Sequence, residues 1–120
     1  RGHASPGAAW RVGIQHPLDR AAIAAVVDAS DLAVATSGTY ERGEHVVDPR
    51  TGRAPVGVLS VTITGPDLGR ADAYSTAAFA LGPDAARWTM GLPRGYEALT
   101  ITSENHVLST AGFPFAEIDR

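Results

Sequence analysis

The feature that most constrains this chain is a strand signal that leads directly into a helix signal. Residues 58–64 (VLSVTIT) set Val and Ile among hydroxyl residues, which is typical of a β-strand. Residues 65–67 (GPD) interrupt that strand, and the Ala-rich stretch after them predicts a helix over residues 69–81. Residues 82–83 (GP) form a stop signal, and a second helix, opened by residues 83–84 (PD), is expected over residues 83–90.

Other segments favour extended structure. Alternating large apolar residues predict a strand over residues 10–14, and residues 96–103 and 107–110 predict a closing hairpin. Residues 21–35 combine the alanines of a helix with the β-branched residues of a strand, so one helix followed by a strand, or two short strands, both fit. Strands dominate. This indicates an α+β fold, in which one or two helices pack on an antiparallel sheet, or half of a larger α/β assembly.

The polar segments predict turns. Residues 36–40 are turn-like, residues 41–44 form a tight charged turn, and residues 45–47 resume an extended pattern. Residues 48–52 (DPRTG) predict a rigid turn, because Pro fixes its own φ and Gly tolerates a positive one. Residues 113–115 are expected to be a loose tail.

Composition excludes several classes of function. The 120 residues are 44% hydrophobic and 19% charged, which fits one globular domain. Ten Lys and Arg residues against thirteen Asp and Glu residues give a net charge of −3 with no basic stripe, so nucleic acid is not an expected partner. The absence of Cys excludes disulfides, thiolate metal sites and a cysteine nucleophile.

Two oxygen-bearing side chains share one face of the expected helix. Asp72 and Thr76 stand four positions apart, so both can reach one point, and their hard oxygens suit Mg²⁺ or Ca²⁺. We expect the helix to start near Asp72, where free backbone N–H groups favour phosphate. The ordinary alternative is a capping Asp and a packed Thr. His45, between a turn and an extended segment, could be a general base or an ordinary surface histidine.

Three segments occur in an order that resembles the C-terminal half of the ApbE family, the FAD:protein FMN transferases. They are residues 35–42 (ATSGTYER), residues 45–55 (HVVDPRTGRAP) and residues 59–82 (LSVTITGPDLGRADAYSTAAFALG). Residues 10–17 also resemble a family strand, so the resemblance covers nearly the whole chain. It implies two strands over residues 22–35.

The resemblance also implies a larger architecture. Residues 1–120 would be the C-terminal portion of an α/β-type, T-fold-like protein built in two parts, whose N-terminal FAD-binding portion is absent from this sequence. Two positions depart from the family pattern. Thr39 stands where an Asp is usual, and residues 41–44 are a shorter turn than the common one.

The reaction implied by the resemblance is a magnesium-dependent transfer of FMN. Mg²⁺ binds the pyrophosphate of FAD, a threonine hydroxyl of an acceptor flavoprotein attacks the phosphorus on the flavin side, and AMP leaves. The acceptor would be a membrane electron-transfer subunit or an FMN-binding domain. Some relatives hydrolyse FAD to FMN and AMP instead, so an FAD hydrolase is a second hypothesis for the function. A non-catalytic flavin-binding module is a third hypothesis. The expected location is bacterial and extracytoplasmic, either membrane-associated or periplasmic.

Site residues follow from the resemblance position by position. Asp72 and Thr76 match the two side-chain metal ligands, and Ser75 stands where some members place an Asp near the metal. His45 matches a His beside the reacting phosphates, with a role in phosphate stabilisation or as a base. Val47 matches a position that contacts FAD. The segment adjoining the flavin pocket is matched by Thr36, Ser37 and Tyr40.

Overall fold

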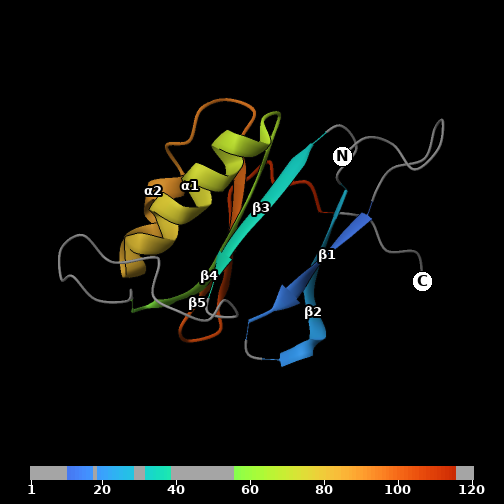
Figure 1. The fold of residues 1–120 in the computed structure, drawn as a ribbon. Coiled ribbons are helices and arrows are strands. Elements are labelled where there is room, and N and C mark those ends of the chain that lie inside the picture. Colours follow the sequence, from blue (N-terminus) through green and yellow to red (C-terminus); the bar gives the residue numbers. More distant parts are fainter. Residues whose placement is uncertain (1–10, 18, 29–31, 39–55, 116–120) are drawn as a thin grey trace.

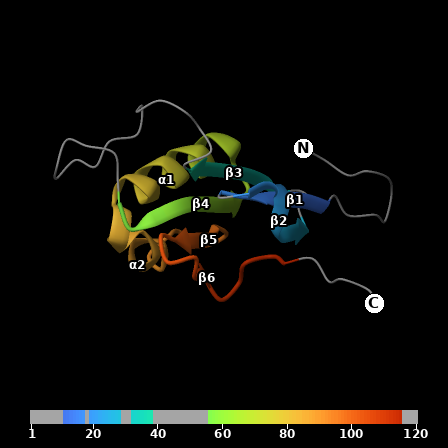
Figure 2. The same ribbon diagram turned by 90° about the horizontal axis from the view of Figure 1, so that it is seen from below.

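A four-stranded antiparallel sheet forms the centre of the molecule, with two helices on one face and a β-hairpin on the other (Figure 1). The computed structural model describes residues 11–17, 19–28, 32–38 and 56–115. The sheet has the order β3-β4-β5-β6, and Figure 2 shows these strands following one another in that order. Its strands are β3 (Ala33–Gly38), β4 (Val58–Gly65), β5 (Glu97–Thr102) and β6 (Val107–Ser109). The expected α+β fold with an antiparallel sheet is confirmed.

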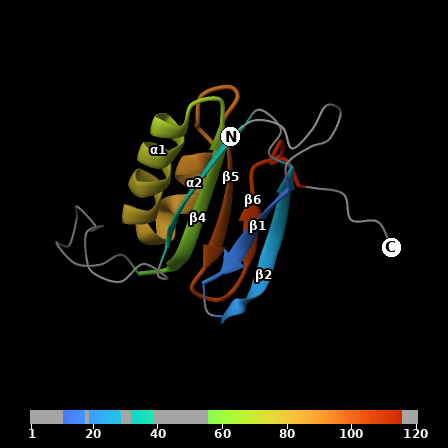
Figure 3. The same cartoon turned by 45° about the vertical axis from the view of Figure 1, so that its right-hand side comes forward.

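The second sheet is a hairpin of β1 (Arg11–His16) and β2 (Asp19–Asp28). It lies across the central sheet from the helices (Figure 3). Because β2 and β3 are separate strands, the two-strand interpretation of residues 21–35 is correct and the helix alternative is wrong. Burial explains why this segment is extended. As part of a strand, Val27 lies between the two sheets, where it is fully buried.

The main helix α1 (Leu68–Ala80) follows β4 after a short turn, as predicted. Its N-cap is Asp67, whose side chain accepts a hydrogen bond from the Arg70 backbone N–H at 2.8 Å. Gly82 follows the helix with φ of +59°, and a Cβ there would lie 2.5 Å from the carbonyl oxygen of Val56. Only Gly fits this position without strain, which explains why the helix stops where the sequence predicts.

The second helical segment is shorter than α1. It comprises a 3₁₀ turn, η1 (Gly82–Asp84), and the helix α2 (Ala85–Thr89), so the helix expected over residues 83–90 is confirmed with a tighter first turn. No helix within the described parts of the chain is long and apolar enough to cross a bilayer.

Alternation along the strands divides the core into two clusters. On the helix side, Val61 and Ile63 of β4 are fully buried in the cluster that contains the small residues Ala71 and Ala78 of α1. These alanines let the helix approach the sheet closely. On the hairpin side, the buried cluster consists of Ile14, Val27, Leu99 and Phe113. The two clusters fix α1 on one face of β3 and β4 and the hairpin on the other.

Two local expectations are wrong. Residues 36–38 are not a turn but the end of β3, because they pair in register with β4, with Thr36 opposite Thr62 and Gly38 opposite Ser60. Residues 113–115 are not a loose tail, because Phe113 is 6% exposed in the second core cluster and Phe115 forms a bridge with Val27. In both places tertiary contacts override local composition. The predicted turns and extended segment within residues 41–52 lie outside the described residues.

Candidate functional site

The two predicted metal ligands lie on the exposed surface of α1. Asp72 and Thr76 are both solvent-exposed and stand one helical turn apart, so their side chains share a face. The expectation that the helix starts near Asp72 is wrong: Asp67 caps the helix, and its first turn contains no acidic residue. Asp72 lies in the second turn, so neither capping nor the helix N-terminus accounts for its carboxylate.

Buried hydroxyl groups connect α1 to β3 beneath this face. Ser37 of β3 is 4% exposed, and its Oγ lies 3.0 Å from Ser75 Oγ and 3.4 Å from Thr76 Oγ1. Ser75 is fully buried, and its Oγ donates a hydrogen bond to the backbone carbonyl of Asp72 at 2.9 Å. Residues from two predicted segments, 38 positions apart along the chain, therefore meet at one point.

Thr36 lies on the opposite face of β3. Consecutive strand residues alternate in direction, so Ser37 faces α1 whereas Thr36 faces away from it. The Thr36 hydroxyl is 2.8 Å from the Thr62 hydroxyl on β4. The two neighbours therefore do not present their hydroxyls to one surface. Three more predicted site residues, Tyr40, His45 and Val47, lie outside the described residues.

The donor chemistry of the α1 face fits a hard divalent cation. A carboxylate and a hydroxyl oxygen are ligands that Mg²⁺ accepts, and Mg²⁺ commonly completes its shell with water and substrate phosphate oxygens. Within the part of the chain that the structure describes, no group of three His, Asp or Glu side chains forms a complete metal cage. Asp72 and Thr76 could therefore supply only part of a ligand set, and their binding of a metal stays a prediction.

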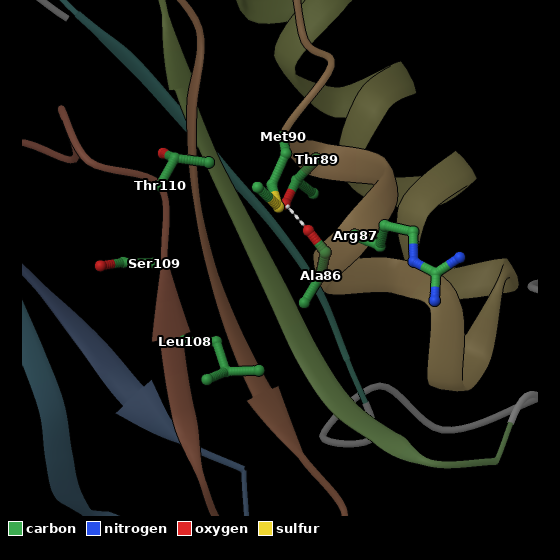
Figure 4. Close-up of a pocket in the computed structure, with 7 residues that line it drawn as sticks. All are labelled: Ala86, Arg87, Thr89, Met90, Leu108, Ser109 and Thr110. Carbon is green, nitrogen blue, oxygen red and sulfur yellow. Dashed lines mark hydrogen bonds between the residues drawn. The ribbon is translucent and has the colours of Figure 1, made fainter.

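A cavity of about 410 Å³ lies elsewhere, between α2 and β6 (Figure 4). Its lining consists of Ala86, Arg87, Thr89, Met90, Leu108, Ser109 and Thr110. The Arg87 guanidinium points away from the β6 residues, so the space is lined mainly by apolar groups and hydroxyls. None of the predicted site residues lines this cavity, and no sequence pattern indicated it.

Sequence reasoning missed one feature of the candidate site among the described residues, the contact between Ser37 and Ser75. Serine on a strand and serine in an Ala-rich helix are each unremarkable in sequence. Only the packing of α1 on β3 brings their hydroxyls together. The signal that could have indicated it is that Ser37 shares the strand face of Ala35, a core residue packed with α1.

Comparison with known proteins gives a consistent result. Residues 1–100 match the sequence profile of the ApbE family. The FAD:protein FMN transferase of Escherichia coli K12 is 41% identical over 98 residues, covering 72% of this chain and 28% of that protein. The FAD:protein FMN transferase of Treponema pallidum is 37% identical over 113 residues, covering 86% of this chain and 31% of that protein.

Solved structures agree with the sequence relatives. The crystal structure of the ApbE protein from Thermotoga maritima superposes with a TM-score of 0.80 and 31% identity, covering 92% of this chain and 38% of that one. The chain thus spans between 28% and 38% of the length of these three relatives. Because the profile match extends over most of the sequence and the fold agrees, this chain belongs to the ApbE family.

Proposed function

We propose that the complete protein containing this chain transfers FMN from FAD to an acceptor protein. The curated relatives named above are FAD:protein FMN transferases, which supports the general reaction. The observation that carries the proposal is the arrangement on α1, where the exposed Asp72 and Thr76 lie one turn apart over the buried Ser37 hydroxyl. Residues 1–120 are then the C-terminal portion of the enzyme, and a preceding portion supplies most FAD contacts.

Asp72 and Thr76 would hold Mg²⁺ in this proposal. Bound Mg²⁺ would neutralise negative charge on the pyrophosphate of FAD. Asp72 supplies the anionic ligand from an exposed position, and Thr76 supplies a neutral one. Ser75 was a third candidate ligand, but its hydroxyl is buried and bonded to the Asp72 carbonyl, so we assign it a positioning role.

The transfer itself is a substitution at phosphorus. A threonine hydroxyl of the acceptor forms a bond to the flavin-side phosphorus, the bond to the AMP oxygen breaks, and the hydroxyl proton passes to a base. His45 is the residue we propose beside the phosphates, as that base or as a hydrogen-bond donor to them. We propose that Val47 contacts FAD and that the segment with Thr36, Ser37 and Tyr40 shapes the pocket.

The partners and location follow from the same proposal. The acceptor would be a membrane electron-transfer subunit or an FMN-binding domain. The enzyme would act outside the bacterial cytoplasm, membrane-associated or periplasmic.

The test is a transfer assay on the complete protein with FAD and an FMN-binding acceptor domain. We expect covalent flavin fluorescence on the denatured acceptor, one AMP released per flavin attached, and loss of both when EDTA removes Mg²⁺. Restoring Mg²⁺ after EDTA is the control for irreversible damage. AMP and free FMN without labelled acceptor would indicate an FAD pyrophosphatase instead. Retained flavin with no AMP release would indicate a non-catalytic flavin-binding module.

A further inference from the structure

A chain of hydroxyl groups runs from the exposed face of α1 into the protein interior. It begins at Thr76 Oγ1, passes to Ser37 Oγ at 3.4 Å and to Ser75 Oγ at 3.0 Å, and ends at the Asp72 backbone carbonyl at 2.9 Å. The two inner members, Ser37 and Ser75, are 4% and 0% exposed, so bulk water does not compete for them. The last acceptor belongs to the residue whose side chain is the other proposed metal ligand.

The direction of the hydrogen bonds among these hydroxyl groups is fixed by the last acceptor, the backbone carbonyl of Asp72. A carbonyl oxygen only accepts, so the Ser75 hydroxyl must donate to Asp72. A hydroxyl has one proton, so Ser75 has none left and must accept from Ser37. Ser37 in turn has used its proton and can only accept from Thr76. A hydrogen bond between Thr76 and Ser37 therefore requires the Thr76 proton to point inward, toward Ser37.

We propose that Ser37 and Ser75 are positioning residues that orient the Thr76 hydroxyl for metal binding, an inference that rests on the proposed function. A neutral hydroxyl binds a cation through an oxygen lone pair, and a proton pointing outward would oppose it. With the Thr76 proton held inward, the lone pairs of Oγ1 stay available to a cation on the exposed side shared with Asp72. The ligand is thus oriented before Mg²⁺ arrives, and less ordering is required on binding.

The long contact between the Thr76 and Ser37 hydroxyl groups is consistent with this role. The distance from Thr76 Oγ1 to Ser37 Oγ is 3.4 Å, beyond the usual 2.5–3.0 Å of hydroxyl pairs. A cation on Thr76 Oγ1 would withdraw electron density and make its O–H a stronger donor. We therefore expect this contact to shorten when Mg²⁺ binds, as hydrogen bonds in active sites do when the ligand is present.

A purely structural role makes a different prediction from a positioning role. Replacing both partners of a buried hydrogen bond by apolar groups can leave stability nearly unchanged, because neither partner is left unsatisfied. The double variant Ser37→Ala/Ser75→Ala removes both inner hydroxyls. It would leave folding little affected under either role, but only the positioning role predicts weaker binding of Mg²⁺.

The experiment titrates Mg²⁺ alone into the complete protein by isothermal calorimetry and measures the free energy of unfolding of each variant. We expect Ser37→Ala, Ser75→Ala and the double variant each to raise the Mg²⁺ Kd by about tenfold or more, the usual effect of losing a group that orients a ligand. Thr76→Val should raise it at least as much, whereas Thr76→Ser keeps the hydroxyl and should stay close to wild type.

The matched control is Thr89→Ala. The Thr89 hydroxyl is also buried and donates to a backbone carbonyl three residues earlier, that of Ala86, at 2.6 Å. It belongs to α2, so we expect its removal to cost similar stability and leave the Mg²⁺ Kd unchanged.

The outcomes separate this inference from the proposed function. If Thr76→Val weakens Mg²⁺ binding but the serine variants match Thr89→Ala, the positioning inference is wrong and the ligand assignment stands. If Thr76→Val and Asp72→Ala both bind Mg²⁺ like wild type, the ligand assignment is wrong and the positioning inference is wrong with it.

Discussion

Replacing Asp72 by Ala is expected to lower the rate of flavin transfer by roughly a hundredfold to ten thousandfold, since a catalytic metal stabilises the transition state by several kcal/mol. Asp72 is the anionic member of the proposed ligand pair, and Thr76 alone is neutral, so the site loses its charge complementarity to Mg²⁺. Asp72→Asn should lose most activity as well, because it keeps the shape and removes the charge. The measurement is the initial rate of AMP release and of acceptor labelling at saturating FAD and Mg²⁺.

The control for Asp72→Ala is a surface carboxylate removed elsewhere. Glu104, in the β5–β6 turn, has an 81% exposed side chain that lies 3.8 Å from His106. Glu104→Ala changes net charge as Asp72→Ala does, and an exposed pair of this kind contributes little to stability. Its transfer rate should equal that of wild type. A wild-type rate in Asp72→Ala would show that the metal assignment is wrong.

Replacing Gly65 by Ala is expected to destabilise the protein by about 3 kcal/mol, the upper part of the usual range for overpacking a core. A Cβ at Gly65 would overlap the ring carbons Cδ2 and Cε2 of Tyr96. That ring is 6% exposed and packs edge-on against Tyr74 of α1, with centroids 5.1 Å apart, so it has no free space to enter. The measurement is urea denaturation followed by far-UV circular dichroism.

A second Gly→Ala substitution provides the control. Gly69 is exposed in the first turns of α1, and its nearest contact for a Cβ is Asp67 Oδ2 at 3.4 Å. Ala is the better helix former, so Gly69→Ala should stabilise the protein by up to about 1 kcal/mol. Equal stabilities for Gly65→Ala and wild type would contradict the close packing of β4 against Tyr96.

Local signals predicted the central unit of the fold correctly. The strand β4, its Gly-Pro interruption and the helix α1 are each defined by short-range preferences, and the structure keeps all three. Residues 36–38 were mispredicted because hydroxyl residues and Gly favour turns locally. Their pairing with β4 depends on residues more than twenty positions away, which no local window contains.

In the candidate site, too, features set by local sequence were predicted and features set by tertiary packing were not. The i and i+4 spacing of Asp72 and Thr76 could be read from the sequence because helix geometry is local. The predicted helix start at residue 69 is within one residue of Leu68, but Asp72 was wrongly expected near the helix N-terminus, because the sequence did not show that Asp67 caps the helix. The contact between Ser37 and Ser75 could not be predicted, because it depends on how closely α1 packs against β3.

Diffraction from crystals of the complete protein soaked with Mn²⁺ shows whether α1 provides two ligands of a divalent metal site. Mn²⁺ replaces Mg²⁺ at oxygen sites and gives an anomalous signal. We predict a peak within about 2.5 Å of both the Asp72 carboxylate and Thr76 Oγ1, the range for oxygen ligands of such cations. The contact from Thr76 Oγ1 to Ser37 Oγ should be shorter than the 3.4 Å described above. A bound Mn²⁺ coordinated by other residues, with Asp72 and Thr76 free in solvent, would show that α1 does not provide these two ligands.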